Sequence, residues 1–297
     1  MKLLNSYKNG NVRILIFDDG TRIINIPDDE KPNLEFPLSM DFKITKWCDQ
    51  NCPMCHEKTN INGKHADIMN LHFIDKLHKG TEIAIGGGKV TSHPDLKPFL
   101  RKLKSLGVIP SITVHQEEYK KNKTLINELL EEKLIYGLGI SFFNKDDEFW
   151  KEILKNENVV VHLIAGIHEK NIFDYLSNLD CKILILGYKN WGRGMELLNT
   201  NMSEKIRENI QWLKENLAAY KSNFKVVSFD NKAIEQLNVQ DLLTDDEWKE
   251  FYQGDDGTMT MYVDGVNQQF AKTSTSEKRY DLLDNIEDMF KIIKEND

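Results

Sequence analysis

Short apolar runs alternate with amphipathic stretches rich in lysine and glutamate along most of the chain. The runs are short enough to be buried strands, and they lie at 41–45, 82–87, 111–115, 138–143, 159–166, 182–188 and 224–229. The stretches between them carry apolar residues at helical spacing, near 70–79, 95–106, 122–133, 146–155, 170–178 and 203–220. Strand and helix in alternation predict parallel strands with right-handed crossovers, in a β/α barrel or a doubly wound sheet. Six such units and one extra strand favour an open, partial barrel.

The two ends of the chain show a different pattern. Residues 12–26 form two β-type runs around Asp19-Gly20, a pair that favours a hairpin turn. Residues 258–274 predict a second hairpin that turns at Asp264-Gly265, and residues 277–295 predict a closing helix. We therefore expect an N-terminal β-hairpin extension at 1–37, a barrel core at 38–230, and a C-terminal closure of helix, hairpin and helix at 231–297.

Length, composition and charge narrow the class of protein. A chain of 297 residues suits one α/β barrel. It has no apolar run of about 18 residues and no basic-then-apolar leader at Met1, so we expect a cytoplasmic protein without a membrane span. The net charge of −8 weighs against nucleic acid as a partner, because phosphate neutralisation requires a basic face. Three of the four cysteines are bunched, which indicates metal binding rather than disulfides.

The bunched cysteines are Cys48, Cys52 and Cys55, in the stretch "ITKWCDQNCPMCHEKT" at 44–59. They directly follow the first barrel strand, in the loop at its carboxyl end, where β/α barrels build their active sites. In a four-iron cluster each iron takes one outside ligand, so three cysteines leave one iron open to a substrate or cofactor. Two alternatives remain at this point: a zinc ion with His56 as the fourth ligand, and a purely structural cluster.

The order Cys48-Asp-Gln-Asn-Cys52-Pro-Met-Cys55 resembles the CxxxCxxC motif of the radical S-adenosylmethionine superfamily. The resemblance implies a partial (β/α)6 barrel, a 4Fe-4S cluster, and S-adenosyl-L-methionine bound at the open iron. It implies that the cofactor is cleaved to methionine and a 5′-deoxyadenosyl radical, which abstracts hydrogen from the substrate. A flavodoxin or ferredoxin donor and sensitivity to oxygen follow from the low potential of such clusters.

Further stretches resemble the family's cofactor contacts. The family's GGEPTLHPDL stretch is similar to "IGGGKVTSHPDL" at 85–96, where Lys89 stands in the usual glutamate position. Its GxIxGxxE stretch is similar to "HLIAGIHEKN" at 162–171, where His162 replaces the first glycine. A lysine cannot accept a hydrogen bond from the ammonium of the cofactor, whereas a carboxylate can. The expected cofactor contacts are Met54, Gly86, Gly87, Gly88, Lys89, Ser141, Ile164, Gly166 and Glu169.

The substrate would meet the same end of the barrel. Tyr188, Lys189 and Arg193 lie in the aromatic, basic and glycine-rich stretch "LGYKNWGRG" after the sixth strand, and His115 ends the third strand. These four residues are the candidates for substrate contact or acid/base chemistry. Alternatively, the charges of this turn are solvated, and His115 is structural. A small molecule, a nucleotide-derived metabolite or a peptide would fit such a mouth.

The fourth cysteine sets a limit on the number of clusters. Cys181 precedes the sixth strand, so we expect a buried residue at the amino end of the sheet, away from the active face. No cysteine follows it, so the chain lacks the C-terminal ligands that auxiliary clusters would need. We therefore predict a single-cluster radical enzyme. The rival hypotheses are a zinc-stabilised binding module and a degenerate relative that binds the cofactor without cleaving it, the latter suggested by Lys89.

Overall fold

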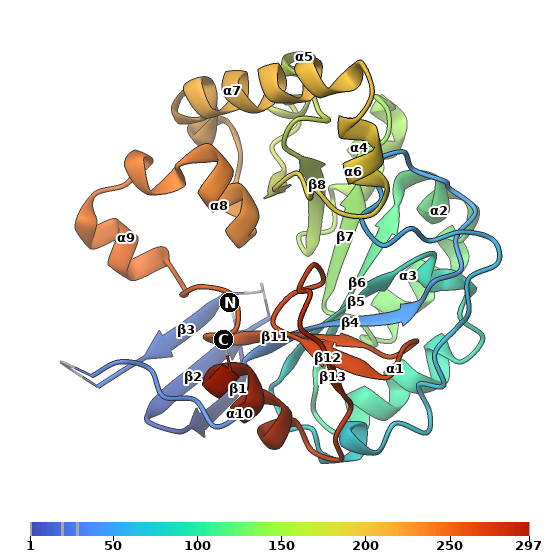
Figure 1. The fold of residues 1–297 in the computed structure, drawn as a ribbon, viewed down its shortest axis with the longest axis vertical. Coiled ribbons are helices and arrows are strands. Elements are labelled where there is room, and N and C mark those ends of the chain that lie inside the picture. Colours follow the sequence, from blue (N-terminus) through green and yellow to red (C-terminus); the bar gives the residue numbers. More distant parts are fainter. Residues whose placement is uncertain (1, 19–20, 28–29, 297) are drawn as a thin grey trace.

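The computed structural model describes residues 2–18, 21–27 and 30–296, and it contains one large, curved sheet and one small sheet (Figure 1). The large sheet has ten strands in the order β10-β9-β8-β7-β6-β5-β4-β11-β12-β13. Its first seven strands run parallel and match the seven predicted runs. They are β4 (Ser39–Thr45), β5 (Glu82–Gly87), β6 (Ile109–His115), β7 (Gly137–Ser141), β8 (Val159–Ile164), β9 (Lys182–Leu186) and β10 (Val226–Phe229). The predicted open, partial barrel is confirmed.

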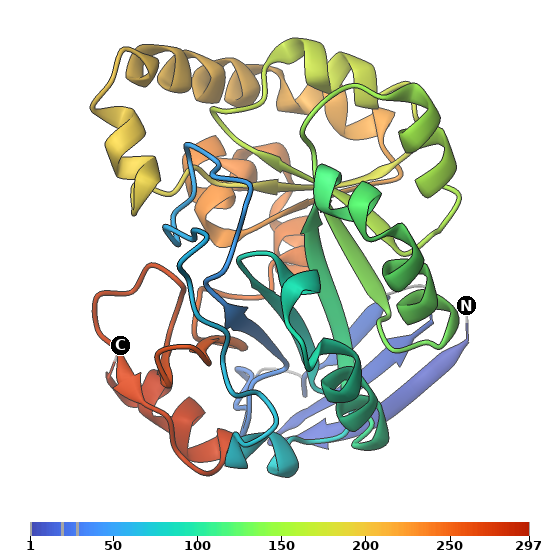
Figure 2. The ribbon, with the colours of Figure 1, turned by 90° about the vertical axis from the view of Figure 1, so that its right-hand side faces the viewer.

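Helices follow the strands; most of them cover the outer face of the sheet, whereas the two that follow β10 lie at its open edge (Figures 1 and 2). They are α1 (Leu96–Ser105), α2 (Gln116–Lys121), α3 (Lys123–Glu131), α4 (Asp147–Ile153), α5 (Lys170–Leu176), α6 (Arg193–Leu198), α7 (Met202–Tyr220), α8 (Asn231–Leu237) and α9 (Asp245–Phe251). Short 3-10 helices are η1 (His72–Lys76), η2 (Val90–Ser92), η3 (Lys221–Asn223) and η4 (Val239–Leu242). Among the described residues, no helix is long and apolar enough to cross a membrane.

The helices between the parallel strands differ from the prediction in three places. The helix expected at 70–79 is only the 3-10 turn η1, because the chain before it forms a turn at 67–70 and already buries Ile68 and Leu71. The aromatic, basic and glycine-rich stretch at 186–194, for which no helix was predicted, ends in α6, whose first residue is Arg193. The sequence analysis also missed α2, which begins directly after β6.

The two faces of the large sheet differ in the size of their side chains. On β4, Met40, Phe42 and Ile44 are almost completely buried on the helix-covered side. The side chains that alternate with them face the inside of the barrel, where neighbouring strands contribute mainly small or polar residues. These inward residues include Asp41, Lys43, Ala84, Gly86, Ser111, Thr113, Gly137, Gly139, Ser141 and His162. Because most of them are small, the inside of the barrel stays open.

The small sheet is formed by β1 (Leu3–Asn9), β2 (Val12–Phe17) and β3 (Arg22–Asn25), and it lies at the lower left in Figure 1 and at the lower right in Figure 2. β2 and β3 pair antiparallel, which confirms the N-terminal hairpin. Its predicted turn at Asp19-Gly20 lies outside the described residues. β1 was not predicted, because its pattern "LLNSYKN" mixes polar and apolar residues without burying most of them.

The C-terminal hairpin belongs to the barrel wall. β11 (Thr260–Asp264) pairs antiparallel with β12 (Gln269–Ala271), as predicted, and it also pairs parallel with β4. The closing helix is shorter than predicted: α10 (Ile286–Asn296) begins after Asn285, which accepts a hydrogen bond from the Asp288 amide at 2.8 Å. The preceding residues contain β13 (Tyr280–Asp281), which pairs with β12. The sheet is thereby extended beyond β4, while β10 remains at its open edge.

Candidate active site

The three bunched cysteines lie in a loop at the carboxyl end of β4, as predicted. Cys48, Cys52 and Cys55 are free, half-buried thiols. The loop is shaped by main-chain hydrogen bonds, from the Cys48 amide to the Asn60 carbonyl at 3.0 Å and from the Cys55 amide to the Cys52 carbonyl at 3.2 Å. Burial raises the pKa of the Cys52 thiol, and the neighbouring Cys55 and Cys48 raise it further. The three thiols therefore lie close enough to interact.

The ligands in the cysteine loop suit an iron–sulfur cluster better than a single metal ion. Within the described ranges, no three or more His, Cys, Asp or Glu side chains are placed around a point where they could hold a single metal ion. The loop instead presents three separate thiols, the ligand type that iron–sulfur clusters take. Cys181 is buried before β9, at the opposite end of the sheet, and donates to the Leu176 carbonyl. The donor set therefore fits three corners of one four-iron cluster.

Arg193, at the start of α6, ties the cysteine loop to the end of β9. Its Nε donates to the Cys52 carbonyl at 2.9 Å and its Nη1 to the Thr59 carbonyl at 2.9 Å. Its backbone amide donates to the Cys55 carbonyl at 3.0 Å. The preceding Gly192 lies so close to the loop that a Cβ there would be 2.2 Å from the His56 carbonyl oxygen. The planar guanidinium thus links two parts of the cysteine loop. The sequence analysis had instead assigned Arg193 to substrate contact.

Tyr188 and Lys189 precede Arg193 and differ in their surroundings. Tyr188 is buried, and its hydroxyl donates to the Gly194 carbonyl at 2.7 Å. Lys189 lines a cavity and donates from Nζ to the Ser274 hydroxyl at 3.1 Å. Burial, and secondly the positive charge of Lys189, lower the pKa of His56 to about 3, so that this histidine is neutral. Of the predicted basic residues, Lys189 is therefore the one that lies between the cysteine loop and the cavity.

The glycine stretch after β5 packs against the beginning of the cysteine loop. The Gly88 amide donates to the Thr45 carbonyl at 2.8 Å, and a Cβ at Gly88 would be 2.1 Å from the Trp47 carbonyl oxygen. Gly87 has a φ of +114°, a conformation that side chains rarely adopt. At Gly86, in contrast, a Cβ would meet nothing within 4 Å. Gly87 and Gly88 therefore let two strand ends approach, and Gly86 leaves an open strand edge inside the barrel.

Lys89, the departure from the family pattern, has a partner in the cysteine loop. Its ammonium lies 2.8 Å from the Asp49 carboxylate and 5.7 Å from the centre of the Trp47 ring. The Lys89 side chain is nearly buried, whereas that of Asp49 is about one third exposed. The hydrogen bond from Lys89 outweighs burial and lowers the pKa of Asp49. A carboxylate is thus present beside this position, although it comes from a different residue than in the family.

Three polar side chains form a row across adjacent strands. His115 on β6 is in register with Ser141 on β7, which is in register with His162 on β8. The Nδ1 of His115 accepts a hydrogen bond from the Glu117 amide at 3.2 Å and so caps α2. Burial alone lowers the pKa of His162 to about 4. Its ring occupies the space over Gly139, where a Cβ would be 2.4 Å from the ring.

The remaining expected cofactor contacts are spread around the same end of the barrel. Ile164 ends β8, and the Gly166 carbonyl accepts a hydrogen bond from the Asn209 side chain of α7 at 3.0 Å. Glu169 is partly exposed and forms an ion pair with Lys205. Met54 is half-buried in the cysteine loop. The ion pair of Glu169 faces solvent, as for a carboxylate in the first turn of a helix.

A buried ion network below the cysteine loop was missed by the sequence analysis. Lys43 is inward-facing on β4, and its ammonium lies 2.6 Å from Glu57 and 2.6 Å from Asp264. The Tyr262 hydroxyl donates to Glu57 at 2.8 Å. The side chains of Lys43 and Asp264 are 3% and 1% exposed, so these charges depend on each other for compensation. The network joins the cysteine loop to the C-terminal hairpin, and a lysine inside a buried strand was the signal in the sequence.

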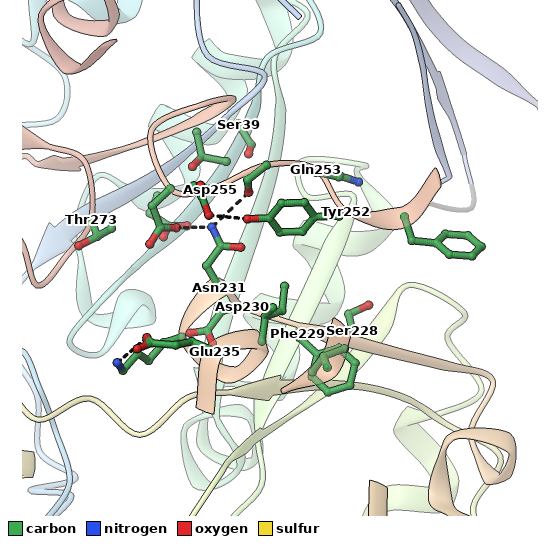
Figure 3. A pocket seen from close by; sticks show the side chains of 18 of the residues that line it. Ser39, Ser228, Phe229, Asp230, Asn231, Glu235, Tyr252, Gln253, Asp255 and Thr273 are labelled. Atoms are coloured by element: carbon green, nitrogen blue, oxygen red, sulfur yellow. Dashed lines mark hydrogen bonds and ion pairs between the residues drawn. The ribbon is translucent and has the colours of Figure 1, made fainter. Parts of the chain in front are cut away.

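A cavity of about 1270 Å³ lies along the open edge of the barrel. Its walls come from β4 and β11 on one side and from β10, α8 and α9 on the other, and Lys189 and Trp191 line it next to the cysteine loop. Figure 3 shows the side chain of Asn231, at the start of α8, pointing toward the segment that contains Asp255. Asn231 donates to the Asp256 carboxylate at 2.8 Å and so bridges the two walls.

Comparison with solved structures identifies the fold. SuiB of Streptococcus suis, determined with bound S-adenosylmethionine, matches 99% of this chain and 87% of its own, with a TM-score of 0.61 and 11% identity. SuiB bound to the precursor peptide SuiA matches 89% of this chain and 66% of its own, with a TM-score of 0.58 and 14% identity. The protein anSMEcpe, with bound AdoMet and the Cp18Cys peptide, matches 87% of this chain and 81% of its own, with a TM-score of 0.52 and 13% identity.

No protein-family model matches the chain, and no curated protein matches its sequence. The similarity is therefore one of fold: the chain has the partial barrel of the radical S-adenosylmethionine enzymes SuiB and anSMEcpe. The predicted fold is confirmed in this respect. Cys48, Cys52 and Cys55 stand directly after β4, the first strand of the barrel.

Proposed function

We propose that this chain is a single-cluster radical S-adenosylmethionine enzyme, and that it works in the cytoplasm, where free thiols stay reduced. The observation that supports this most strongly is the set of three interacting thiols in one loop, at the carboxyl end of the first strand of this fold. Cys48, Cys52 and Cys55 would hold a 4Fe-4S cluster. A flavodoxin or ferredoxin would supply the electron.

With S-adenosylmethionine, such a cluster supplies a 5′-deoxyadenosyl radical, which abstracts hydrogen from the substrate. The chain's own residues hold, orient and enclose the reacting groups. Arg193 fixes the carbonyls of Cys52 and Thr59 and thereby sets the shape of the ligand loop. The buried contacts of Lys43 with Glu57 fix the other side of that loop.

The expected cofactor contacts lie around the open end of the barrel. The free edge at Gly86 would receive the methionine end of the cofactor, and the row of Ser141 and His162 would lie nearer the nucleoside. Lys89 holds the Asp49 carboxylate at this edge. We propose that Asp49 accepts from the cofactor's ammonium and that Lys89 meets its carboxylate, which restores the charge pattern that the missing glutamate would provide.

The decisive experiment uses anaerobically purified, cluster-reconstituted protein. We expect about four irons and four sulfides per chain, and 5′-deoxyadenosine from S-adenosylmethionine under strong reductant. Cys52→Ala should lose both the full iron content and the product. Cys181→Ala is the matched control, because Cys181 is buried at the far end of the sheet and should leave both unchanged. Zinc in place of iron would refute the proposal.

A protein that binds S-adenosylmethionine without cleaving it is the second candidate, and Lys89 is the observation that favours it. Calorimetric titration of the cofactor into reconstituted Lys89→Met, Asp49→Asn and the unmodified protein tests the role of the pair in binding, and an assay of 5′-deoxyadenosine on the unmodified protein separates the two candidates. If the pair binds the cofactor, each variant should weaken binding about tenfold or more, and the unmodified protein should produce 5′-deoxyadenosine. Tight binding without product, even in the presence of substrate candidates, would favour the second candidate.

A further inference from the structure

A threonine side chain contacts one of the three cysteines that would hold the cluster. The Thr59 hydroxyl oxygen lies 3.4 Å from the sulfur of Cys55, which stands four positions earlier in the cysteine loop. This distance suits a hydrogen bond that involves sulfur, whose atom is larger than oxygen. The sequence analysis did not single out Thr59, because the residues around it form no pattern that indicates this contact.

The state of the Cys55 sulfur determines which of the two atoms donates. In the free thiol either atom could be the donor. A cysteine binds iron as a thiolate, which carries no proton and can only accept a hydrogen bond. With a cluster in the loop, the Thr59 hydroxyl therefore donates to the ligand sulfur.

The Thr59 side chain has little freedom to turn away from this sulfur. It is 2% exposed, and the Cys55 sulfur is the one hydrogen-bond partner that the described residues offer its hydroxyl. The Thr59 carbonyl accepts from Arg193 at 2.9 Å, and the amide of the next residue, Asn60, donates to the Lys46 carbonyl at 3.1 Å. A branched Cβ restricts rotation of the side chain, and a buried hydroxyl that turned away would lose its hydrogen bond. The contact is therefore held from both the main chain and the side chain.

A hydrogen bond to a ligand sulfur affects how readily the cluster is reduced. In this step the cluster takes up one electron, the flavodoxin or ferredoxin loses one, and no covalent bond forms or breaks. The added negative charge lies partly on the ligand sulfurs, and a hydroxyl donor stabilises a sulfur more strongly as its charge grows. Hydrogen bonds to the sulfurs are among the factors that set the potential of an iron–sulfur cluster. The Thr59 hydroxyl should therefore raise this potential.

We propose that Thr59 is a positioning residue that tunes the reduction potential of the cluster through Cys55. This inference rests on the proposed function, since it concerns the cluster that Cys48, Cys52 and Cys55 would hold. The hydroxyl acts on the ligand sulfur and needs no contact with the cofactor or the substrate. Its effect can therefore be measured on the cluster itself, apart from activity.

The test is a redox titration of the reconstituted full chain, followed by the electron paramagnetic resonance signal of the reduced cluster. Thr59→Val removes the hydroxyl and keeps the branched shape. We expect the equilibrium constant for one-electron reduction to fall about three- to tenfold, where tenfold corresponds to a potential about 59 mV lower. Thr59→Ser retains the hydroxyl and should keep the potential close to that of the unmodified protein. Thr81→Val is the matched control, because Thr81 is 1% exposed and precedes β5, at the far end of the sheet.

Equal potentials in Thr59→Val and the unmodified protein would overturn the inference. A fall of the same size in Thr59→Ser would also overturn it, since that variant keeps the donor. If Thr59→Val takes up less iron, Thr59→Ala is titrated in its place, because it too lacks the hydroxyl and has less volume to fit. Loss of the cluster from both variants would mean that Thr59 holds the loop rather than tunes the potential, and the inference would fail.

Metal content and cofactor cleavage distinguish a failure of this inference from a failure of the proposed function. Zinc in the unmodified protein would overturn both. A four-iron cluster and 5′-deoxyadenosine, together with an unchanged potential in Thr59→Val, would overturn this inference alone. A lowered potential in Thr59→Val, without 5′-deoxyadenosine from the unmodified protein, would uphold the inference and overturn the proposed function.

Discussion

The cysteine loop and the cavity wall are neighbours, but they are held in different ways. Main-chain hydrogen bonds fix the loop on both sides, among them those from Lys46 to Lys64 at 2.8 Å and from Lys89 to Trp47 at 2.7 Å. The two walls of the cavity are bridged by side chains, such as Asn231 to Asp256 and Lys189 to Ser274. Side-chain bridges next to solvent open at a lower free-energy cost than a buried network of main-chain bonds. The chain thus combines a rigid ligand loop with an entrance that can move.

The largest effect is expected from breaking the buried ion network under the cysteine loop. Lys43→Met would leave Glu57 and Asp264 facing each other without their cation, so the free energy of unfolding should fall by about 3–5 kcal/mol. Lys170→Met is the control, because it breaks the exposed ion pair with Asp174. Urea unfolding of the iron-free full chain measures both. A change below about 1 kcal/mol for Lys43→Met would mean that the loop is not held by this network.

The dependence of the free energy of unfolding on pH tests whether His162, in the row of polar side chains inside the barrel, is enclosed. The pKa of His162 falls from 6.5 in the unfolded chain to about 4 in the folded protein, so the folded state binds fewer protons between these values. Above pH 6.5 the ring is neutral in both states, and the folded protein pays no cost for burying it. As the pH falls from 6.5 toward 4, the unfolded chain takes up the proton first, so the free energy of unfolding decreases. The loss from this residue is up to roughly 3 kcal/mol.

The variant His162→Asn should make the free energy of unfolding less dependent on pH between 6.5 and 4. It is measured by urea unfolding of the iron-free chain at several pH values. His72→Asn, which replaces an exposed histidine in η1, should leave the dependence as it is. An unchanged slope in His162→Asn would show that His162 is not enclosed in the folded state.

Arg193 tests how far the rigid loop depends on one side chain. Arg193→Lys keeps the charge but cannot span the Cys52 and Thr59 carbonyls with a planar fork, so the loop should lose about 1–3 kcal/mol of stabilisation. The reconstituted variant should then lose iron to a chelator at least several-fold faster than the unmodified protein. Arg207→Lys, on the exposed surface of α7, is the matched control. Equal rates in all three proteins would contradict a positioning role for Arg193.

The cysteine loop and the cavity also differ in how well the sequence predicts them. The strands, the cysteines and the glycine edge could be predicted, because each depends on residues that are close together in the chain. Arg193 lies 141 positions from Cys52, and nothing in its own neighbourhood indicates that contact. The partner of Lys89 also depends on the fold, since Asp49 lies 40 positions away. Local patterns thus predict which groups are present, and only the structure shows which of them are paired.

The same reasoning explains the errors at the C-terminal end. The apolar spacing at 277–295 predicted one long helix, but Tyr280 pairs with Phe270 and stacks on it with ring centres 5.2 Å apart. Cross-strand pairing to a distant segment therefore overrides the helical preference of the first residues. The inward lysine of β4 was counted as part of an apolar run, although a buried lysine requires a carboxylate partner.

The smallest effect is expected at the entrance itself. Asn231→Ala removes the hydrogen bond to Asp256 and should lower the free energy of unfolding by only about 1 kcal/mol, since the freed carboxylate can be solvated. Hydrogen exchange of the 252–258 amides should become several-fold faster, because the wall loses one of its bridges, while exchange at 46–60 should stay unchanged. Asn216→Ala, which removes a side-chain bond within α7, should change neither segment. Faster exchange in both segments would mean that the entrance and the ligand loop open together, and the contrast between a rigid loop and a movable wall would then fail.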